Sequence, residues 1–233
     1  MSYANIAALV VFAVCWLAYA PLLRAFARQQ RGSVLNTDMT VLRASWMANM
    51  AHRKDRFMDG QLLGHALSSA SFFASSNLIL IAATASALFG GARTFATVSS
   101  LEVVQTSSRL LFELQLALIL ATLARGLLDF MWSIRQMNYC LAAIGAAPAD
   151  MSDEVADRYG DAAARVLNPA LSSFNAGVRC YYFALSVGAW LFGPWPFMAA
   201  TIGAVVLLFW RQRSSASAAA VRELRDLLET RRG

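Results

Sequence analysis

The chain has 233 residues, of which 58% are hydrophobic and only 15% are charged. A soluble domain carries about 25% charged residues, so this composition excludes an ordinary soluble domain. Apolar blocks of about 20 residues predict membrane-spanning helices, and they do not alternate as the strands of a β-barrel would. The net charge of +6 is almost all arginine. We interpret it as loop charge that sets topology and touches anionic lipid, with no motif that reads nucleic acid.

The first apolar block covers residues 4–23, with no Lys or Arg before it and several arginines after it. The positive-inside rule therefore predicts that the N-terminus lies outside the cytoplasm. A cleaved signal peptide is the alternative, because Ala18-Tyr19-Ala20 resembles a cleavage site. The absence of a basic segment before the block, and Pro21 directly after the site, favour an uncleaved anchor.

Residues 37–58 predict a helix, with Asn36 or Thr37 available to cap it. Its apolar stripe suits either the membrane interface or packing on the protein itself. The basic cluster between residues 52 and 56 ends this segment and precedes the central span. The start of that span is therefore predicted to be cytoplasmic.

The central span, residues 60–91, contains no Asp, Glu, Lys or Arg. It is long enough to cross the hydrocarbon core. Its first half carries Ser68, Ser71 and Ser75, which indicate either a close-packing face for another helix or the lining of a polar pathway. Asn77 lies near mid-span, and its amide needs a partner because an unpaired amide in lipid is costly.

Residues 92–108 are predicted to form an outer loop, followed by a helix over residues 109–143 with its membrane part at 110–130. Arg109 with Glu113, and Arg125 with Asp129, are spaced to pair along one helix face. The two pairs either mark the two interfaces or lie partly within the bilayer. Ionisable residues in a bilayer are functional candidates, so Glu113, Arg125 and Asp129 join the three serines and Asn77 as candidate pathway residues.

Residues 145–168 are polar and predict a short amphipathic helix that Pro169 terminates. Its acidic residues form a solvated face or oppose the basic cluster. The last apolar block, residues 174–210, is too long for one span, and Gly193-Pro194-Trp195-Pro196 interrupts it. We expect a hairpin with arms at 178–192 and 197–210, with one long kinked helix as the alternative. Residues 214–232 predict an amphipathic tail helix.

No motif for catalysis, phosphate binding or metal binding is present. His52 and His65 are thirteen positions apart and do not share a helix face. The three cysteines, Cys15, Cys140 and Cys180, are interpreted as buried thiols, since no Cys-x-x-Cys motif occurs. The sequence therefore predicts no catalytic residue, no metal and no cofactor.

Three stretches carry a family resemblance: Arg43-x-x-Trp46-Met47 with Arg53-x-x-Arg56-x-x-Asp59, then Ser71-Phe72-Phe73-Ala74-Ser75, then Arg179-x-Tyr181-Tyr182-Phe183. On these residues the chain resembles the bacterial membrane proteins of domain-of-unknown-function family 599. The resemblance implies a membrane protein, and the additional Pro194 departs from the family pattern. It marks a patch on the cytoplasmic, headgroup side: Arg43, Trp46, Arg53, Arg56, Asp59, Arg179, Tyr181 and Tyr182.

These observations predict an all-α integral membrane protein with three long transmembrane helices and a C-terminal, proline-broken hairpin. Residues 1–213 form the membrane domain, and residues 214–233 form a cytoplasmic tail. The expected location is the bacterial inner membrane, with the C-terminus cytoplasmic. The expected partners are membrane lipid and either further copies of the chain or other membrane subunits. The leading hypothesis is a small homo-oligomeric channel or transporter, and the alternatives are an assembly subunit or a lipid-active enzyme.

Overall fold

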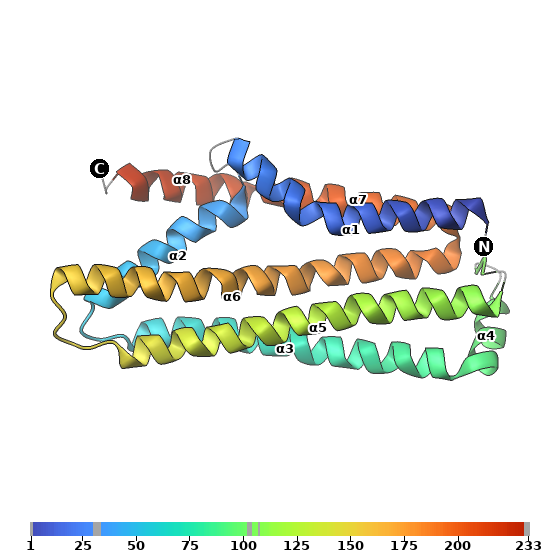
Figure 1. Ribbon diagram of the computed structural model, residues 1–233, viewed down its shortest axis with the longest axis horizontal. Coiled ribbons are helices and arrows are strands. Elements are labelled where there is room, and N and C mark those ends of the chain that lie inside the picture. The colour runs from blue at the N-terminus through green and yellow to red at the C-terminus, as the bar shows by residue number, and fades with distance from the viewer. Residues whose placement is uncertain (1, 30–33, 102–103, 107, 231–233) are drawn as a thin grey trace. The chain divides into compact units, whose positions relative to one another are not determined.

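The computed structural model describes residues 2–29, 34–101, 104–106 and 108–230, and over these residues it contains helices and no strand. This confirms the predicted all-α class. The helices are α1 (Tyr3–Gln29), α2 (Leu35–His52), α3 (Phe57–Phe89), α4 (Gly91–Ser99), α5 (Arg109–Ala146), α6 (Asp153–Gly188), α7 (Pro194–Arg213) and α8 (Ala216–Thr230), with a short 3-10 helix at Ala189–Phe192 (Figure 1).

Within the described residues, four helical stretches are long and apolar enough to cross a membrane: Tyr3–Leu23, Phe57–Phe89, Arg109–Ala146 and Pro194–Thr230. Their surfaces carry large apolar side chains. In α3, Phe72 is 67% exposed and Ile79 is 70% exposed. Exposed apolar area of this kind fits contact with lipid. These features are those of a multi-pass helical membrane protein.

The chain divides into two compact units. Unit 1 comprises Met1–Ala25, Ser75–Leu128 and Gly177–Trp210, and unit 2 comprises Phe26–Ala74, Asp129–Ala176 and Arg211–Gly233. The long helices α3, α5 and α6 contribute residues to both units.

An aromatic cluster forms the core of unit 1. The ring of Phe12 in α1 lies 5.4 Å from that of Phe197 in α7 and 5.9 Å from that of Phe183 in α6. The ring of Trp190 stacks on Phe197 at 5.0 Å between centroids. Trp190, Phe183 and Phe197 are all almost fully buried. These contacts hold α1, α6 and α7 together, because large rings bury more apolar area than any other side chains.

The chain reverses within unit 1 at Gly193. This residue has φ of 114°, a conformation that glycine adopts without a steric penalty. Pro194 then opens α7, where proline fits the first helical turn. Across the reversal, Ser186 of α6 donates a hydrogen bond to the carbonyl of Ala200 in α7 at 3.1 Å. The end of α6 and the start of α7 therefore lie side by side.

The core of unit 2 is built from small and flexible apolar side chains. Met47 and Met50 of α2 pack with Leu63 of α3, Met137 of α5 and Leu167 of α6. Each of these five residues is at most 1% exposed. Methionine fills irregular gaps between helices, which suits a core where four helices meet at different angles.

Pro169 does not terminate a helix, contrary to the sequence prediction, because α6 runs through it from Asp153 to Gly188. Proline removes one hydrogen bond from a helix interior and usually bends or ends it. Here Leu167 and Ala170 are fully buried on either side of Pro169. Their packing offsets the lost bond and keeps the chain helical.

The predicted outer loop at residues 92–108 is wrong in its first half, where α4 forms. Phe95 of α4 packs on Phe112 of α5 at 5.8 Å between ring centroids, which stabilises this short helix. The predicted helix at 37–58 is also corrected, since α2 ends at His52 and α3 begins at Phe57. The Asp55 carboxylate accepts a hydrogen bond from the Phe57 N–H at 2.9 Å, so it caps a new helix at that point.

The start of α2 differs as well. Val34 occupies the cap position without a side-chain cap, so neither Asn36 nor Thr37 has that role. Asn36 instead accepts a hydrogen bond from Asn175 of α6 at 3.1 Å. The apolar stripe of α2 was expected either at the membrane interface or packed on the protein. Met50 of that stripe is fully buried and therefore packs on the protein.

Candidate functional site

The turn between α2 and α3 is organised around a buried carboxylate. Asp59 is 0% exposed, and its Oδ1 accepts hydrogen bonds from Trp46 Nε1 at 2.7 Å and from Arg53 Nη1 at 2.5 Å. Asp59 stands in the first turn of α3, where the helix dipole favours a negative charge. The structure thus brings together three of the eight predicted patch residues and joins them to one another.

Arg56 of the same turn donates its hydrogen bonds to backbone carbonyls. Its guanidinium donates to the carbonyls of Met50 and Ala51 at the end of α2, at 3.2 and 3.1 Å. It also donates to the carbonyls of Ala147 and Pro148 after α5, at 2.7 and 2.9 Å. Carbonyls at a helix end have no partner within the helix, and a cation there satisfies them. Arg56 therefore ties the end of α2 to the end of α5.

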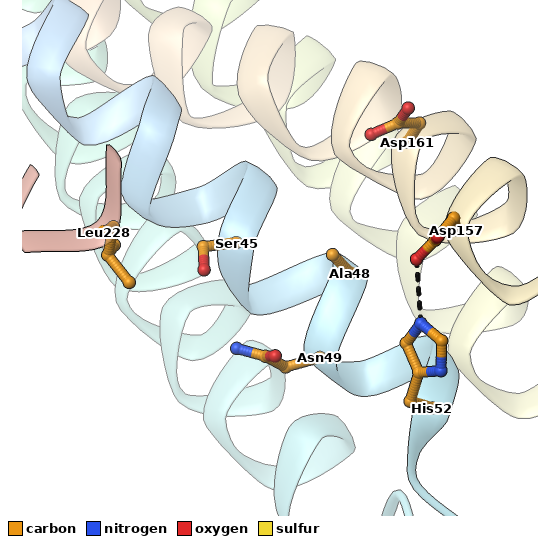
Figure 2. Close-up of a pocket in the computed structure, with 7 residues that line it drawn as sticks. All are labelled: Ser45, Ala48, Asn49, His52, Asp157, Asp161 and Leu228. Atoms are coloured by element: carbon orange, nitrogen blue, oxygen red, sulfur yellow. Dashed lines mark hydrogen bonds and ion pairs between the residues drawn. The ribbon is translucent and has the colours of Figure 1, made fainter. Parts of the chain in front are cut away.

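A polar pocket of about 630 Å³ lies beside α2 in unit 2. Figure 2 shows Asp157 of α6 pointing at His52 of α2, and the two side chains are 2.8 Å apart. A second acid, Asp153, is 3.6 Å from the other ring nitrogen of His52. The remaining lining residues are Ser45, Ala48, Asn49, Asp161 and Leu228. The α6 acids thus meet His52, not the arginines of the basic cluster that they were considered to oppose.

The tail helix α8 is attached to α2 by a buried ion pair. Arg225 Nη1 of α8 donates to Asp38 Oδ1 of α2 at 2.7 Å. The Asp38 side chain is 1% exposed and the Arg225 side chain is 16% exposed. Water contributes little screening at such burial, so the interaction is stronger than a surface pair. The pair holds α8 beside the pocket, which Leu228 lines.

Arg43 differs from the other arginines of the patch in unit 2. It is 8% exposed, and its buried Nε and Nη1 atoms have no hydrogen-bond acceptor among the described residues. Burial lowers the pKa of Arg43 to about 10, because the charged form loses hydration. A guanidinium with that pKa still carries its charge at neutral pH.

The candidate pathway residues occupy different environments. Ser68, Ser71 and Ser75 are exposed on the surface of α3. Asn77 is buried instead, and its Nδ2 donates to the carbonyl of Leu123 in α5 at 2.9 Å. Gly126 of α5 makes room for this contact, since a Cβ there would lie 3.2 Å from Asn77 Nδ2. The expected partner of Asn77 is therefore the backbone of α5.

The candidate charged residues of α5, in contrast to the buried Asn77, are exposed or half-buried. Glu113 pairs with Arg109 at 2.7 Å, with side chains 34% and 56% exposed, at the N-terminal end of the helix. Arg125 is exposed and Asp129 is half-buried, and both interact with other groups. The first pair matches the predicted spacing.

The remaining patch residues, Arg179, Tyr181 and Tyr182, belong to unit 1 and are half-buried in α6. The Arg179 guanidinium lies 5.5 Å from the centroid of the Tyr19 ring in α1, within cation–π distance. This contact joins α6 to α1 inside unit 1.

A buried polar network in unit 1 was missed by the sequence analysis. Gln115 Nε2 donates to the Trp190 carbonyl at 3.0 Å, and its Oε1 accepts from Thr106 at 3.0 Å. Trp190 Nε1 donates to Asn5 at 2.8 Å. Asn5, Gln115 and Trp190 border a cavity of about 230 Å³. The sequence does carry a signal for this network. Asn5 and Gln115 are each the one amide side chain of an apolar span, and such an amide requires a partner, as Asn77 does.

Among the residues that the structure describes, no group of three or more His, Cys, Asp or Glu side chains is placed to hold a metal ion. The four long apolar helices of the described chain are those of a multi-pass helical membrane protein. The chain belongs to the protein family of unknown function DUF599, which matches residues 7–217. This match confirms the family resemblance. No curated protein and no solved structure matches the chain.

Proposed function

We propose that the chain forms a small homo-oligomeric channel or transporter whose polar pathway lies between copies, along the exposed face of α3. The proposed setting is the bacterial inner membrane, with the N-terminus outside and the C-terminus cytoplasmic. The basic residues Arg53, Lys54 and Arg56 before α3, and Arg211 and Arg213 at the end of α7, support this orientation.

The observation that carries the proposal is a repeating polar and small series on α3. Gln61, Ser68, Ser75 and Ala82 recur every seven residues, and all four are exposed. A seven-residue repeat keeps one stripe facing a neighbouring helix in a left-handed pair, and small residues let the two backbones approach closely. Polar side chains toward lipid are unfavourable, so this face is better matched by a partner or by water than by acyl chains.

Two amides buried in unit 1 are bonded to backbone carbonyls and so do not line a route through that unit. The side-chain amides of Asn77 and Gln115 each donate a hydrogen bond to a backbone carbonyl of a neighbouring helix. Those bonds hold α3 to α5, and α5 to the 3-10 helix that follows α6. This arrangement supports a pathway formed between copies in preference to one through a single chain.

Cysteine cross-linking in membranes tests the interface. In a background where Cys15, Cys140 and Cys180 are alanine, Ser68→Cys and Ser75→Cys should form cross-linked dimers with a short bis-maleimide. Leu80→Cys is the matched control, because Leu80 is 43% exposed on the same helix about 140° from Ser75. Equal cross-linking at Leu80 and at the serines, or none at the serines, contradicts the proposed interface.

Ion flux from liposomes tests the pathway itself. Ser75→Leu should lower the flux about tenfold, because an apolar constriction resists wetting. Glu113→Gln should lower it as well if Glu113 attracts cations to the outer mouth. Leu80→Val is the control and should leave the flux unchanged. A wild-type protein that gives no flux and isolates with an unrelated membrane subunit on this face would favour the assembly role instead.

A further inference from the structure

Arg43 occupies a position where an apolar residue is expected. It precedes Met47 by one turn of α2 and Met50 by two, and these three residues share the side of α2 that faces the unit 2 core. Arg43 is 8% exposed, while Met47 and Met50 are fully buried. A permanent charge has therefore been placed on the apolar stripe of the helix, where it loses most of its hydration.

The other arginines on this helix and turn show how such a charge is normally satisfied. Arg53 pairs with the Asp59 carboxylate, and Arg56 donates to four backbone carbonyls. Arg225 pairs with Asp38. Arg43 has neither arrangement among the residues that the structure describes, where its buried Nε and Nη1 atoms meet no hydrogen-bond acceptor. The described part of the chain thus supplies a charge and two free donors but no carboxylate paired with them.

A neighbouring amide on α6 is also incompletely satisfied. Asn168 donates to the carbonyl of Thr40, three residues before Arg43, over a long 3.4 Å. Its Oδ1 is buried and has no donor. This amide offers Arg43 no counter-charge, because an amide carries no net charge.

We propose that Arg43 is the anchor of an oxyanion-binding site in unit 2, which takes the phosphate of a lipid headgroup or a free phosphate. A guanidinium presents several N–H donors in a plane and matches the oxygens of phosphate better than any other side chain. A bound phosphate supplies both the missing counter-charge and the missing acceptors. Water would supply only acceptors. This site does not depend on whether copies of the chain associate.

Thermal unfolding of the purified, delipidated protein in detergent tests the site and separates the two sources. Wild type, Arg43→Met and Arg43→Lys are compared in sodium phosphate and in sodium chloride of equal ionic strength. Arg165→Met is the matched control, because Arg165 is an exposed arginine on α6 three residues from Asn168. A parallel sample is reconstituted into nanodiscs that contain phosphatidylglycerol. The phospholipid that stays bound to the protein is then counted by native mass spectrometry.

If the site takes free phosphate, saturating phosphate should raise the Tm of wild type by about 3–6 °C, the shift expected at ten times Kd. Arg165→Met should show the same shift and Arg43→Met none. If the site takes a lipid phosphate, wild type and Arg165→Met should retain one phospholipid that Arg43→Met loses. Arg43→Lys should retain part of either effect, because lysine keeps the charge without the planar donors.

In chloride and without lipid, Arg43→Met should be at least as stable as wild type, since methionine suits the apolar stripe and removes an unpaired buried charge. The proposal is overturned if wild type neither gains Tm in phosphate nor retains a phospholipid. It is equally overturned if Arg43→Met keeps the same response as wild type. The wild-type measurements decide the first point even if Arg43→Met does not fold.

Discussion

At the scale of single residues, the buried charged groups of unit 2 differ in whether they have a partner of opposite charge. Asp59 pairs with Arg53 of the same turn and Asp38 pairs with Arg225 of α8, whereas Arg43 has no carboxylate partner among the described residues. Burying a charge is costly unless it is paired. The two paired carboxylates therefore fix the chain around them, and the unpaired guanidinium is left as a binding group.

Asp59→Asn should lower the stability of the protein by about 1–2 kcal/mol. The asparagine can still accept from Trp46, but Arg53 loses its ion pair and returns to water, which its 47% exposure allows. Thermal unfolding followed by tryptophan fluorescence measures the change. Glu113→Gln is the control, because it breaks an exposed ion pair and should cost less than about 1 kcal/mol. Equal losses in the two variants would contradict the assigned role of Asp59.

Gly160→Ala should destabilise unit 2 by about 1–3 kcal/mol. A Cβ at Gly160 would lie 2.6 Å from Ala48 Cα and 2.9 Å from the Met47 carbonyl oxygen, so α6 and α2 would have to separate. Gly203→Ala in α7 is the matched control, since a Cβ there meets nothing within 4 Å. That change should be neutral or stabilising, because alanine favours a helix. The two Tm values measured in one detergent decide the matter, and a tolerated Gly160→Ala would refute the close contact.

At the scale of elements, the tail helix α8 should depend on one contact more than on its neighbours. Asp38→Asn removes the buried carboxylate that Arg225 reaches, and it should speed tryptic cleavage within α8 about tenfold by releasing the helix. Asp226→Asn removes a carboxylate that contacts the same arginine at 2.6 Å but is 57% exposed. It should change the cleavage rate little. Similar rates for both variants would show that the buried pair does not hold the tail.

The helices that could be predicted from the sequence are those with long apolar runs or a strong break. The central span, the helix from Arg109 and the reversal at Gly193-Pro194 all follow from composition and proline chemistry. The errors arose where tertiary packing overrides local signals. Pro169 lies inside a helix that buried Leu167 and Ala170 hold, and α4 forms where Phe95 meets Phe112.

Pairings between distant residues were beyond reach of the sequence. Asp59 and Trp46 are thirteen positions apart, and Trp190 and Asn5 are 185 apart. Helical periodicity gives the face on which a residue lies but not which helix covers that face. The family resemblance marked Arg43 and Asp59 together, yet only the contacts distinguish the paired carboxylate from the unpaired guanidinium.

At the scale of the whole molecule, the distribution of arginine predicts a cytoplasmic C-terminus. Green fluorescent protein fused after the last residue should fluoresce, because it folds in the cytoplasm. Alkaline phosphatase fused at the same place should stay inactive. An epitope tag at the N-terminus should be accessible on intact spheroplasts. An active phosphatase fusion would reverse the orientation and place the polar pocket beside His52 on the other side of the membrane.

In the proposed assembly, copies of this chain associate along α3. The most direct test is the native mass of the protein extracted with its surrounding membrane into nanodiscs. We expect one species whose protein mass is a whole multiple, above one, of 25.3 kDa. Ser75→Leu and Ser68→Leu should shift that species toward smaller multiples. A protein mass of 25.3 kDa, or a fixed stoichiometry with a different chain, would contradict the homo-oligomer and assign the exposed face of α3 to another partner or to lipid.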